Sequence, residues 1–241
     1  MIAKRYFFQR FPSASDRSNY KIAIRSGGME GKRLIIFDKD GTLMDTSPGS
    51  FATFDIMIKE HGFQAQPRER WLESLCGPFS KGIQWIFGLS DDQVAPMAIE
   101  FAKTYGRNEE YYNFLEYPGV DETIIELSGR YMLSVATMML EDFAIKSFQA
   151  MDLDGCFLTI RGCPYDRWVT KQELINGCLE TAGVTPEEAV MVGDCLDDLE
   201  SARKAGMDFV GVTYGYGFSE EDCVREGIPF ARTPKELLDI L

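Results

Sequence analysis

The strongest constraint on the fold is an alternation of short apolar runs with helical patterns after residue 117. Each run has the length of a buried strand. The runs lie at residues 131–137, 156–160, 189–194 and 208–213, and helical patterns lie at 171–182 and 196–205. Strands that alternate with helices predict a parallel sheet with helices on both faces. We therefore expect an α/β fold, a doubly wound parallel sheet, formed by residues 29–47 and 118–241 together.

Residues 48–117 interrupt this alternation directly after the first apolar run. Their pattern is helical and is broken by turns. Ser47 followed by Pro48 is typical of a helix start, and Ser90 through Gln93 form a capping box for another helix. Because no strand-like alternation appears among these residues, we expect an all-helical domain inserted into the sheet domain.

The composition narrows the classes of partner and of chemistry. The formal net charge of −13 argues against nucleic acid, because phosphate backbones bind basic surfaces. No apolar run approaches the length of a membrane span, so we expect no membrane contact. Six scattered cysteines without a CxxC pair fit a reducing, cytoplasmic setting. The single histidine, His61, excludes a His-rich zinc site and leaves one candidate for serine–histidine chemistry.

The first 28 residues differ from the rest, because they are basic and rich in serine and contain one acid, Asp16. Such a start is typical of an organelle transit segment, and organelle import is then possible. The alternative is a dispensable extension ahead of a natural start at Met29. Under either interpretation, residues 1–28 form a basic extension that takes no part in the chemistry.

Two aspartates follow the first predicted strand. The apolar run Leu34–Phe37 leads directly into Asp38, Asp40 and Gly41. An apolar run that ends at a glycine turn predicts a buried strand, and open α/β folds bind ligands beyond the carboxyl ends of such strands. Two carboxylates at this edge repel each other unless a cation or a shared proton compensates. The pair therefore indicates a metal ion, a proton donor, or both.

Further polar residues are expected at the same edge. Thr137 ends the second strand, Lys171 begins a helix, and Asp194 and Asp198 follow a later strand. Because the carboxyl ends of parallel strands lie together, three or four carboxylates converge there. A hard divalent cation with oxygen ligands, most naturally Mg²⁺, would neutralise them. Lys171 would offset more of the charge, close to a helix N-terminus that also favours an anion.

The order and spacing of these motifs resemble the haloacid dehalogenase (HAD) superfamily over about residues 33–241. The motifs are DKDGTL at 38–43, the threonine at 137, the lysine at 171, and GDCLDD at 193–198. YPGV at 117–120 and GVTYGYG at 211–217 are similar to the phosphoglycolate-phosphatase-like branch. That branch carries a helical cap of the C1 type after the first strand. The resemblance implies a Rossmann-like core with residues 48–117 as the cap.

The resemblance also implies a role for each motif residue. Asp38 would be the nucleophile that forms an aspartyl-phosphate, and Asp40 would be the general acid and base. Mg²⁺ would be held by the Asp38 carboxylate, the Asp40 backbone carbonyl and Asp194. Thr137 and Lys171 would bind the phosphoryl oxygens.

Three further residues extend or depart from this pattern. Asp198 would contact the metal indirectly, through water or another ligand. Lys81, in the stretch CGPFSK between two cap helices, is a candidate substrate contact. Lys39 stands between the two aspartates, where the family more often has an aromatic or aliphatic residue.

Asp40 favours phosphomonoester chemistry, because relatives that cleave carbon–halogen or carbon–phosphorus bonds lack an acid at this position. The implied function is a Mg²⁺-dependent phosphatase acting on a small phosphorylated metabolite, with phosphoglycolate as the leading substrate. A sugar-phosphate mutase with the same nucleophile and a non-catalytic phosphate-binding protein are the alternatives. The expected assembly is a monomer or a small homo-oligomer.

Overall fold

The computed structural model describes residues 30–165, 167 and 169–241 of the 241-residue chain. The basic extension predicted at residues 1–28 lies outside the described residues. No helix in the described part is long and apolar enough to cross a membrane.

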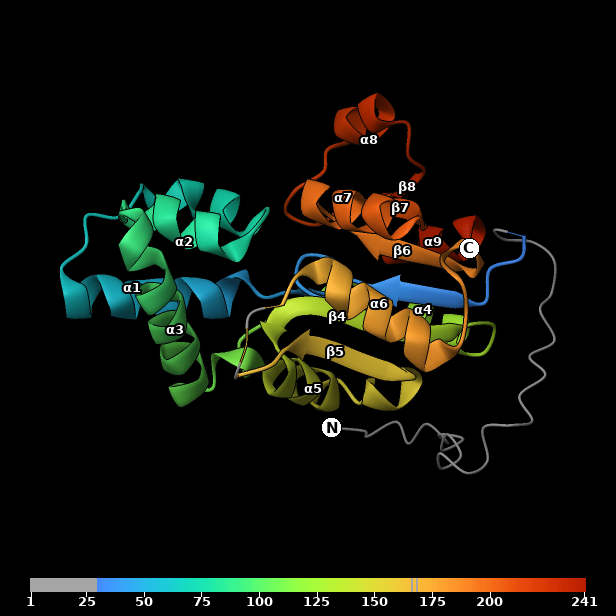
Figure 1. Cartoon of the computed structure of the whole chain (residues 1–241), viewed down its shortest axis with the longest axis horizontal. Coiled ribbons are helices and arrows are strands. Elements are labelled where there is room, and N and C mark those ends of the chain that lie inside the picture. The colour runs from blue at the N-terminus through green and yellow to red at the C-terminus, as the bar shows by residue number, and fades with distance from the viewer. Residues whose placement is uncertain (1–29, 166, 168) are drawn as a thin grey trace.

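A six-stranded sheet forms the centre of the molecule (Figure 1). Its strands, in spatial order, are β5 (Thr159–Cys163), β4 (Met132–Leu140), β1 (Leu34–Phe37), β6 (Ala189–Gly193), β7 (Asp208–Val212) and β8 (Phe230–Ala231). All neighbouring pairs are parallel. The chain leaves β1 in one direction through β4 and β5 and then continues on the other side through β6, β7 and β8. β1 therefore lies beside the switch point where α/β sheets bind ligands.

Helices cover both faces of the sheet, which confirms the predicted doubly wound α/β fold. One face carries α4 (Val120–Ser128), α5 (Glu141–Ala150) and α9 (Leu237–Ile240), and the other carries α6 (Lys171–Ala182), α7 (Leu196–Ala205) and α8 (Glu220–Glu226). Short 3₁₀ turns, η4 (Asp154–Cys156), η5 (Pro186–Glu188) and η6 (Pro234–Glu236), connect elements at the edges. Ile35 and Phe37 pack on the first face and Leu34 and Ile36 on the second. This double burial explains why β1 is apolar at every position.

A helical segment, residues 47–112, lies to one side of the sheet (Figure 1, cyan to green). It consists of α1 (Ser47–His61), η2 (Arg68–Leu75), α2 (Phe79–Phe87), α3 (Asp91–Arg107) and η3 (Glu110–Tyr112). Its own core is aromatic: the Phe54 ring lies 5.7 Å from Trp71, 5.6 Å from Phe87 and 5.4 Å from Phe101. The capping box predicted at Ser90 is present at the start of α3.

Two short strands join the helical segment to the sheet. β2 (Met44–Asp45) enters the segment, β3 (Leu115–Glu116) leaves it, and the two pair antiparallel. The prediction of helices alone over residues 48–117 therefore missed β3, because two residues are too few to produce an alternation. The start predicted for the first helix was also wrong by one residue, since Ser47 is already the first residue of α1 and Thr46 is its cap.

The strand predicted at residues 156–160 was misplaced. Cys156 ends η4, and β5 begins at Thr159. Cys156 and Phe157 are nevertheless buried, so their apolar side chains indicated the core correctly and the strand incorrectly. Helices α5 and α8 and the strand β8 were not predicted.

Candidate active site

The predicted site residues meet at the carboxyl ends of three neighbouring strands. Asp38 follows β1, Thr137 lies in β4, Asp194 follows β6, and Lys171 is the first residue of α6. The backbone N–H of Asp38 donates to the carbonyl of Val192 at 2.9 Å and fixes the turn after β1 against β6. The sheet thus places residues more than 150 positions apart beside one another.

Lys171 bridges two buried carboxylates. Its Nζ donates to Asp38 Oδ1 at 2.6 Å and also to Asp198 Oδ1. A capping box between Thr170 and Glu173 starts α6 and holds Lys171 in place. Burial opposes the charge of the ammonium, but the two carboxylates outweigh it and hold the pKa of Lys171 well above its ordinary value.

Three buried carboxylates cluster here, and Lys171 is paired with two of them, Asp38 and Asp198, but not with the third, Asp194. Burial raises the pKa of Asp38 well above its ordinary value, although Lys171 opposes the shift. Burial, followed by repulsion from Asp198, raises the pKa of Asp194 to about 7. The clustered carboxylate oxygens fit a hard divalent cation, which would favour their ionised forms, and its identity as Mg²⁺ stays a prediction. Asp198 itself is engaged with Lys171.

The loop after β1 wraps closely around the Asp194 carboxylate. Thr42 Oγ1 donates to Asp194 Oδ1 at 3.3 Å, and the backbone N–H of Tyr216 donates to Oδ2 at 2.8 Å. Gly41 has φ +85°, and a Cβ there would lie 2.4 Å from Asp194 Oδ2. The glycine of the DKDGTL motif is therefore required both for its backbone conformation and for this close approach.

Asp40 is held by three side chains. Lys39 Nζ and Thr46 Oγ1 donate to its Oδ1 at 2.9 and 2.7 Å, and Thr137 Oγ1 donates to its Oδ2 at 2.9 Å. Burial favours the neutral acid, but the Lys39 ammonium and these hydrogen bonds together lower the pKa of Asp40 below its ordinary value. Lys39 is completely buried and Asp40 is partly exposed, so the two form a partly buried ion pair.

Thr137 is therefore close to the site, but its hydroxyl is engaged with Asp40. The threonine is fully buried, and Met138, the next residue, lines the cavity instead. The role of Thr137 as a phosphate ligand stays a prediction.

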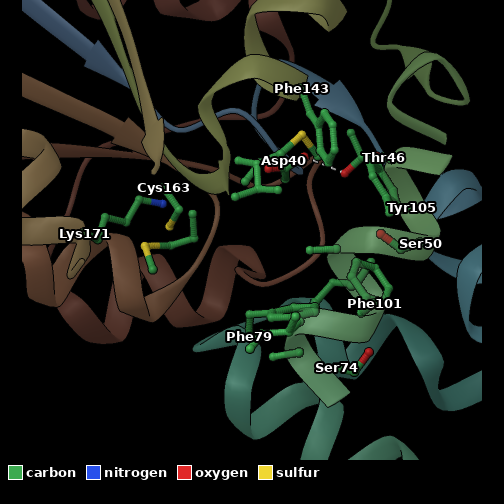
Figure 2. A pocket seen from close by; sticks show the side chains of 18 of the residues that line it. Asp40, Thr46, Ser50, Ser74, Phe79, Phe101, Tyr105, Phe143, Cys163 and Lys171 are labelled. Atoms are coloured by element: carbon green, nitrogen blue, oxygen red, sulfur yellow. Dashed lines mark hydrogen bonds between the residues drawn. The ribbon is translucent and has the colours of Figure 1, made fainter. Parts of the chain in front are cut away.

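A cavity of about 830 Å³ lies between the carboxyl end of the sheet and the helical segment. Figure 2 shows Asp40 and Lys171 on its sheet side and Phe79, Phe101 and Ser74 on the side of the helical segment. Lys81, the candidate substrate contact, is exposed on α2 and is not among the residues that line the cavity.

Residues 35–212 match the family described as haloacid dehalogenase-like hydrolase. The chain belongs to this family. This hydrolase is 30% identical over 219 residues to the N-acetylmuramic acid 6-phosphate phosphatase of Pseudomonas aeruginosa, a match that covers 87% of this chain and 94% of that protein. It is 31% identical over 198 residues to a 5'-nucleotidase of the same organism, covering 81% and 88% of the two chains.

Two further similarities concern a named phosphatase and a solved structure. A phosphoglycolate phosphatase of Nitrosospira multiformis is 28% identical over 199 residues, covering 76% of this chain and 84% of that one. A haloacid dehalogenase-like hydrolase from Streptococcus pneumoniae superposes with a TM-score of 0.78 at 26% identity, covering 87% and 98% of the two chains. The resemblance to HAD phosphatases inferred from the motifs is thus confirmed.

The structure of this hydrolase adds one residue that the sequence did not indicate. Tyr216 Oη accepts hydrogen bonds from the backbone N–H groups of Thr46 at 2.6 Å and Ser47 at 3.1 Å, and it donates to Asp45 Oδ1 at 2.9 Å. Its own backbone N–H contacts Asp194. Tyr216 therefore connects the carboxylate cluster to the start of α1. The sequence signal was limited to the YGYG turn after a strand.

Proposed function

We propose that this hydrolase is a Mg²⁺-dependent phosphatase that cleaves a phosphomonoester through an aspartyl-phosphate on Asp38. The observation that carries the proposal is the arrangement around Asp38. Its carboxylate lies at the cavity, is bonded to Lys171, and is two residues from a second carboxyl group, that of Asp40. The names of the relatives support the same reaction class.

The first half of the reaction uses Asp38 and Asp40. A carboxylate oxygen of Asp38 attacks phosphorus in line, and the bond from phosphorus to the alcohol oxygen breaks. Asp40 gives its proton to that oxygen as the alcohol leaves. The phosphate dianion that enters beside Asp40 raises the pKa of this carboxyl group, which opposes the effect of Lys39 and favours the protonated acid.

The second half returns the enzyme to its starting state. Asp40, now a carboxylate, takes a proton from water as the water oxygen attacks the phosphorus of the aspartyl-phosphate. The bond between phosphorus and Asp38 breaks, and inorganic phosphate leaves. Lys171 stays bonded to Asp198 and stabilises the phosphoryl oxygens and Asp38 throughout.

The cation would be held by the carboxylates of Asp38 and Asp194 and the backbone carbonyl of Asp40. When bound, Mg²⁺ supplies positive charge that lets an anionic phosphoryl group approach an anionic nucleophile. Asp198 orients Lys171 and supports the cluster without direct coordination.

We further propose that the helical segment acts as a cap on a sheet domain formed by residues 29–47 and 118–241. The cap domain is taken as residues 48–117, and the β2–β3 pair is where it would hinge. Closure would exclude water while phosphorus is attacked. Phosphoglycolate, the substrate that the sequence resemblance favours, is the reference compound for the first assay.

The test measures phosphate release from a panel of phosphomonoesters, with Mg²⁺ and with EDTA. The panel contains phosphoglycolate, sugar 6-phosphates and nucleoside 5'-monophosphates. We expect release that requires Mg²⁺, disappears in Asp38→Asn, and persists in the matched control Asp121→Asn on the exposed face of α4. Phosphate returned to a second sugar hydroxyl would favour the mutase. Bound but unconverted phosphate would favour the binding protein.

A further inference from the structure

A continuous aromatic wall lines the cavity beyond its catalytic end. The ring centroids of Phe79 and Phe101 are 4.9 Å apart, those of Phe101 and Tyr105 5.6 Å, and those of Tyr105 and Phe143 6.0 Å. Tyr165 continues the row at 6.2 Å from Phe143. All five rings line the cavity, and Figure 2 shows the first four among its lining side chains. A leaving group attached to phosphorus at Asp38 would extend along this wall.

The helix opposite the catalytic carboxylates leaves room for a large group. Four of the α3 residues that line the cavity are small, Ala95, Ala98, Ala102 and Gly106, and they lie among larger lining residues of the same helix, which include Phe101 and Tyr105. A Cβ at Gly106 would lie 2.4 Å from the ring of Phe143, so only glycine permits this contact. A cavity of about 830 Å³ has the size that encloses a drug-sized ligand, and a two-carbon phosphate occupies only a small part of it.

The cavity offers no buried cation to a second anionic group. Among its described lining residues, Lys171 is the only buried cation, and it is occupied by two carboxylates. The other lining cations are exposed: Lys103, Arg107, which lies 3.6 Å from Glu60, and Arg167, which lies 3.4 Å from Glu173. A carboxylate or second phosphate deep in this space would lose its hydration without gaining a partner.

One buried polar atom in the wall lacks a partner. Tyr105 is 3% exposed, and its hydroxyl has no hydrogen-bond partner among the described residues. Buried hydroxyl groups are nearly always bonded, because an unsatisfied one costs free energy. A hydroxyl, ether or carbonyl oxygen of a ligand in the cavity would satisfy it once a turn of the ring exposes the hydroxyl, which is closed off in this structure.

We propose that the alcohol released by this enzyme is uncharged and carries an apolar, preferably aromatic, ring system, with one polar group that bonds to Tyr105. This inference rests on the proposed phosphatase function and defines its substrate class. It disfavours phosphoglycolate, whose second anionic group has no buried partner and whose two carbons leave the aromatic wall uncovered.

The experiment compares kcat/KM, with Mg²⁺ present, for naphthylmethyl, benzyl and n-propyl phosphates and for phosphoglycolate. The first three release alcohols of similar acidity, so differences among them report contact with the cavity. We expect kcat/KM to rise by more than about tenfold from n-propyl to naphthylmethyl phosphate, with phosphoglycolate below both aryl compounds.

Two variants connect the preference to the cavity. Ala102→Leu fills the space beside α3, and we expect the ratio of kcat/KM for naphthylmethyl over n-propyl phosphate to fall about tenfold. Ala150→Leu, on an exposed position of α5, should leave this ratio unchanged. A set of naphthylmethyl phosphates with a hydroxyl at different ring positions tests Tyr105. At least one should be preferred by the wild type, and Tyr105→Phe should remove that preference without lowering the melting temperature.

The outcomes separate the two levels of the proposal. Phosphate release with phosphoglycolate preferred over the aryl compounds would overturn the substrate class and leave the phosphatase function in place. An unchanged ratio in a folded Ala102→Leu variant would likewise overturn it. No release from any phosphomonoester, including those of the first panel, would overturn the phosphatase function and this inference with it.

Discussion

The two ends of the cavity are built on different principles. At the sheet end, four carboxylates and two buried lysines are fixed by strand ends and by one another. At the end formed by the helical segment, aromatic rings and small residues make a surface without buried charge. Under the proposed function, the reaction depends on the first end, since charge must be placed accurately, and the choice of substrate depends on the second, since shape and apolar area decide it.

A variant at Lys171 gives the largest test of this division, because among the described residues Lys171 is the one cation bonded to Asp38, the proposed nucleophile. We expect Lys171→Met to lower kcat/KM about a thousandfold for every substrate, because the phosphoryl charge loses its donor. We also expect a loss of about 3 kcal/mol in the free energy of unfolding, since Asp38 and Asp198 become unpaired in a buried site.

The double variant Lys171→Met with Asp198→Asn separates these two effects. Removing the second charge should restore part of the stability and none of the activity. Recovery of activity in the double variant would mean that Lys171 serves only to neutralise Asp198, and the sheet end would lose its catalytic cation. Chemical denaturation and steady-state kinetics provide the two measurements.

The variant Asp194→Asn tests how the sheet end of the cavity depends on a metal ion. The pKa of Asp194 is raised from 3.8 to about 7 in the folded protein, so the native state binds more protons than the unfolded chain between these values. The contribution of Asp194 to stability is therefore greatest at low pH and is lost as pH rises to about 7. Without metal, the stability difference between wild type and Asp194→Asn should move against the wild type over this window, by a few kcal/mol.

Mg²⁺ should reverse this trend, because binding to the native state stabilises it by mass action. The increase in melting temperature on adding Mg²⁺ should be larger at about pH 8 than at about pH 5, since the ligand must be ionised. Asp194→Asn should abolish most of that increase. An equal increase in the variant would show that the cation binds elsewhere.

Lys39 tests a feature of the sheet end that departs from the family pattern. Lys39→Met keeps the length of the side chain and removes the positive charge beside Asp40. The pKa of Asp40 should therefore rise. A higher pKa keeps the general acid protonated to higher pH. We therefore expect the alkaline limb of the kcat/KM profile to move upward, with a loss in kcat of about tenfold.

The control for this variant is Lys59→Met, an exposed lysine at the end of α1. It should change neither the pH profile nor kcat. An unmoved alkaline limb in Lys39→Met would assign Lys39 a purely structural role beneath the site. The selectivity among substrates should stay the same in either variant, because the other end of the cavity is untouched.

The difference between the ends also explains what the sequence could predict. Asp38, Asp40, Lys171 and Asp194 are brought together as expected, because residues that follow parallel strands must share one edge. Local patterns are enough to place them: an apolar run, a glycine and a carboxylate. The predicted fold class holds for the same reason.

Side-chain direction was not accessible in this way. The sequence did not indicate that Thr137 donates to Asp40 or that Lys81 is exposed on α2. Their roles as phosphate ligand and substrate contact stay predictions. The contact of Thr137 with Asp40 depends on how segments more than 90 residues apart pack. The aromatic wall likewise depends on the approach of α3 to α5. Spacing within a single helix does not show which residues of α3 meet α5 across the cavity.

Tyr216 joins the two ends, and it gives the smallest expected effect. Tyr216→Phe removes the hydroxyl that accepts from Thr46 and Ser47 and donates to Asp45, and it keeps the backbone bond to Asp194. We expect a loss of about 1 kcal/mol in the free energy of unfolding, since Ser47 still has Asp45 as a partner. Because the lost bonds hold the start of α1, KM should rise for all substrates while the ratio between large and small substrates stays constant. A changed ratio would mean that the entry to the helical segment shapes the apolar end, and the two ends would then be one coupled site.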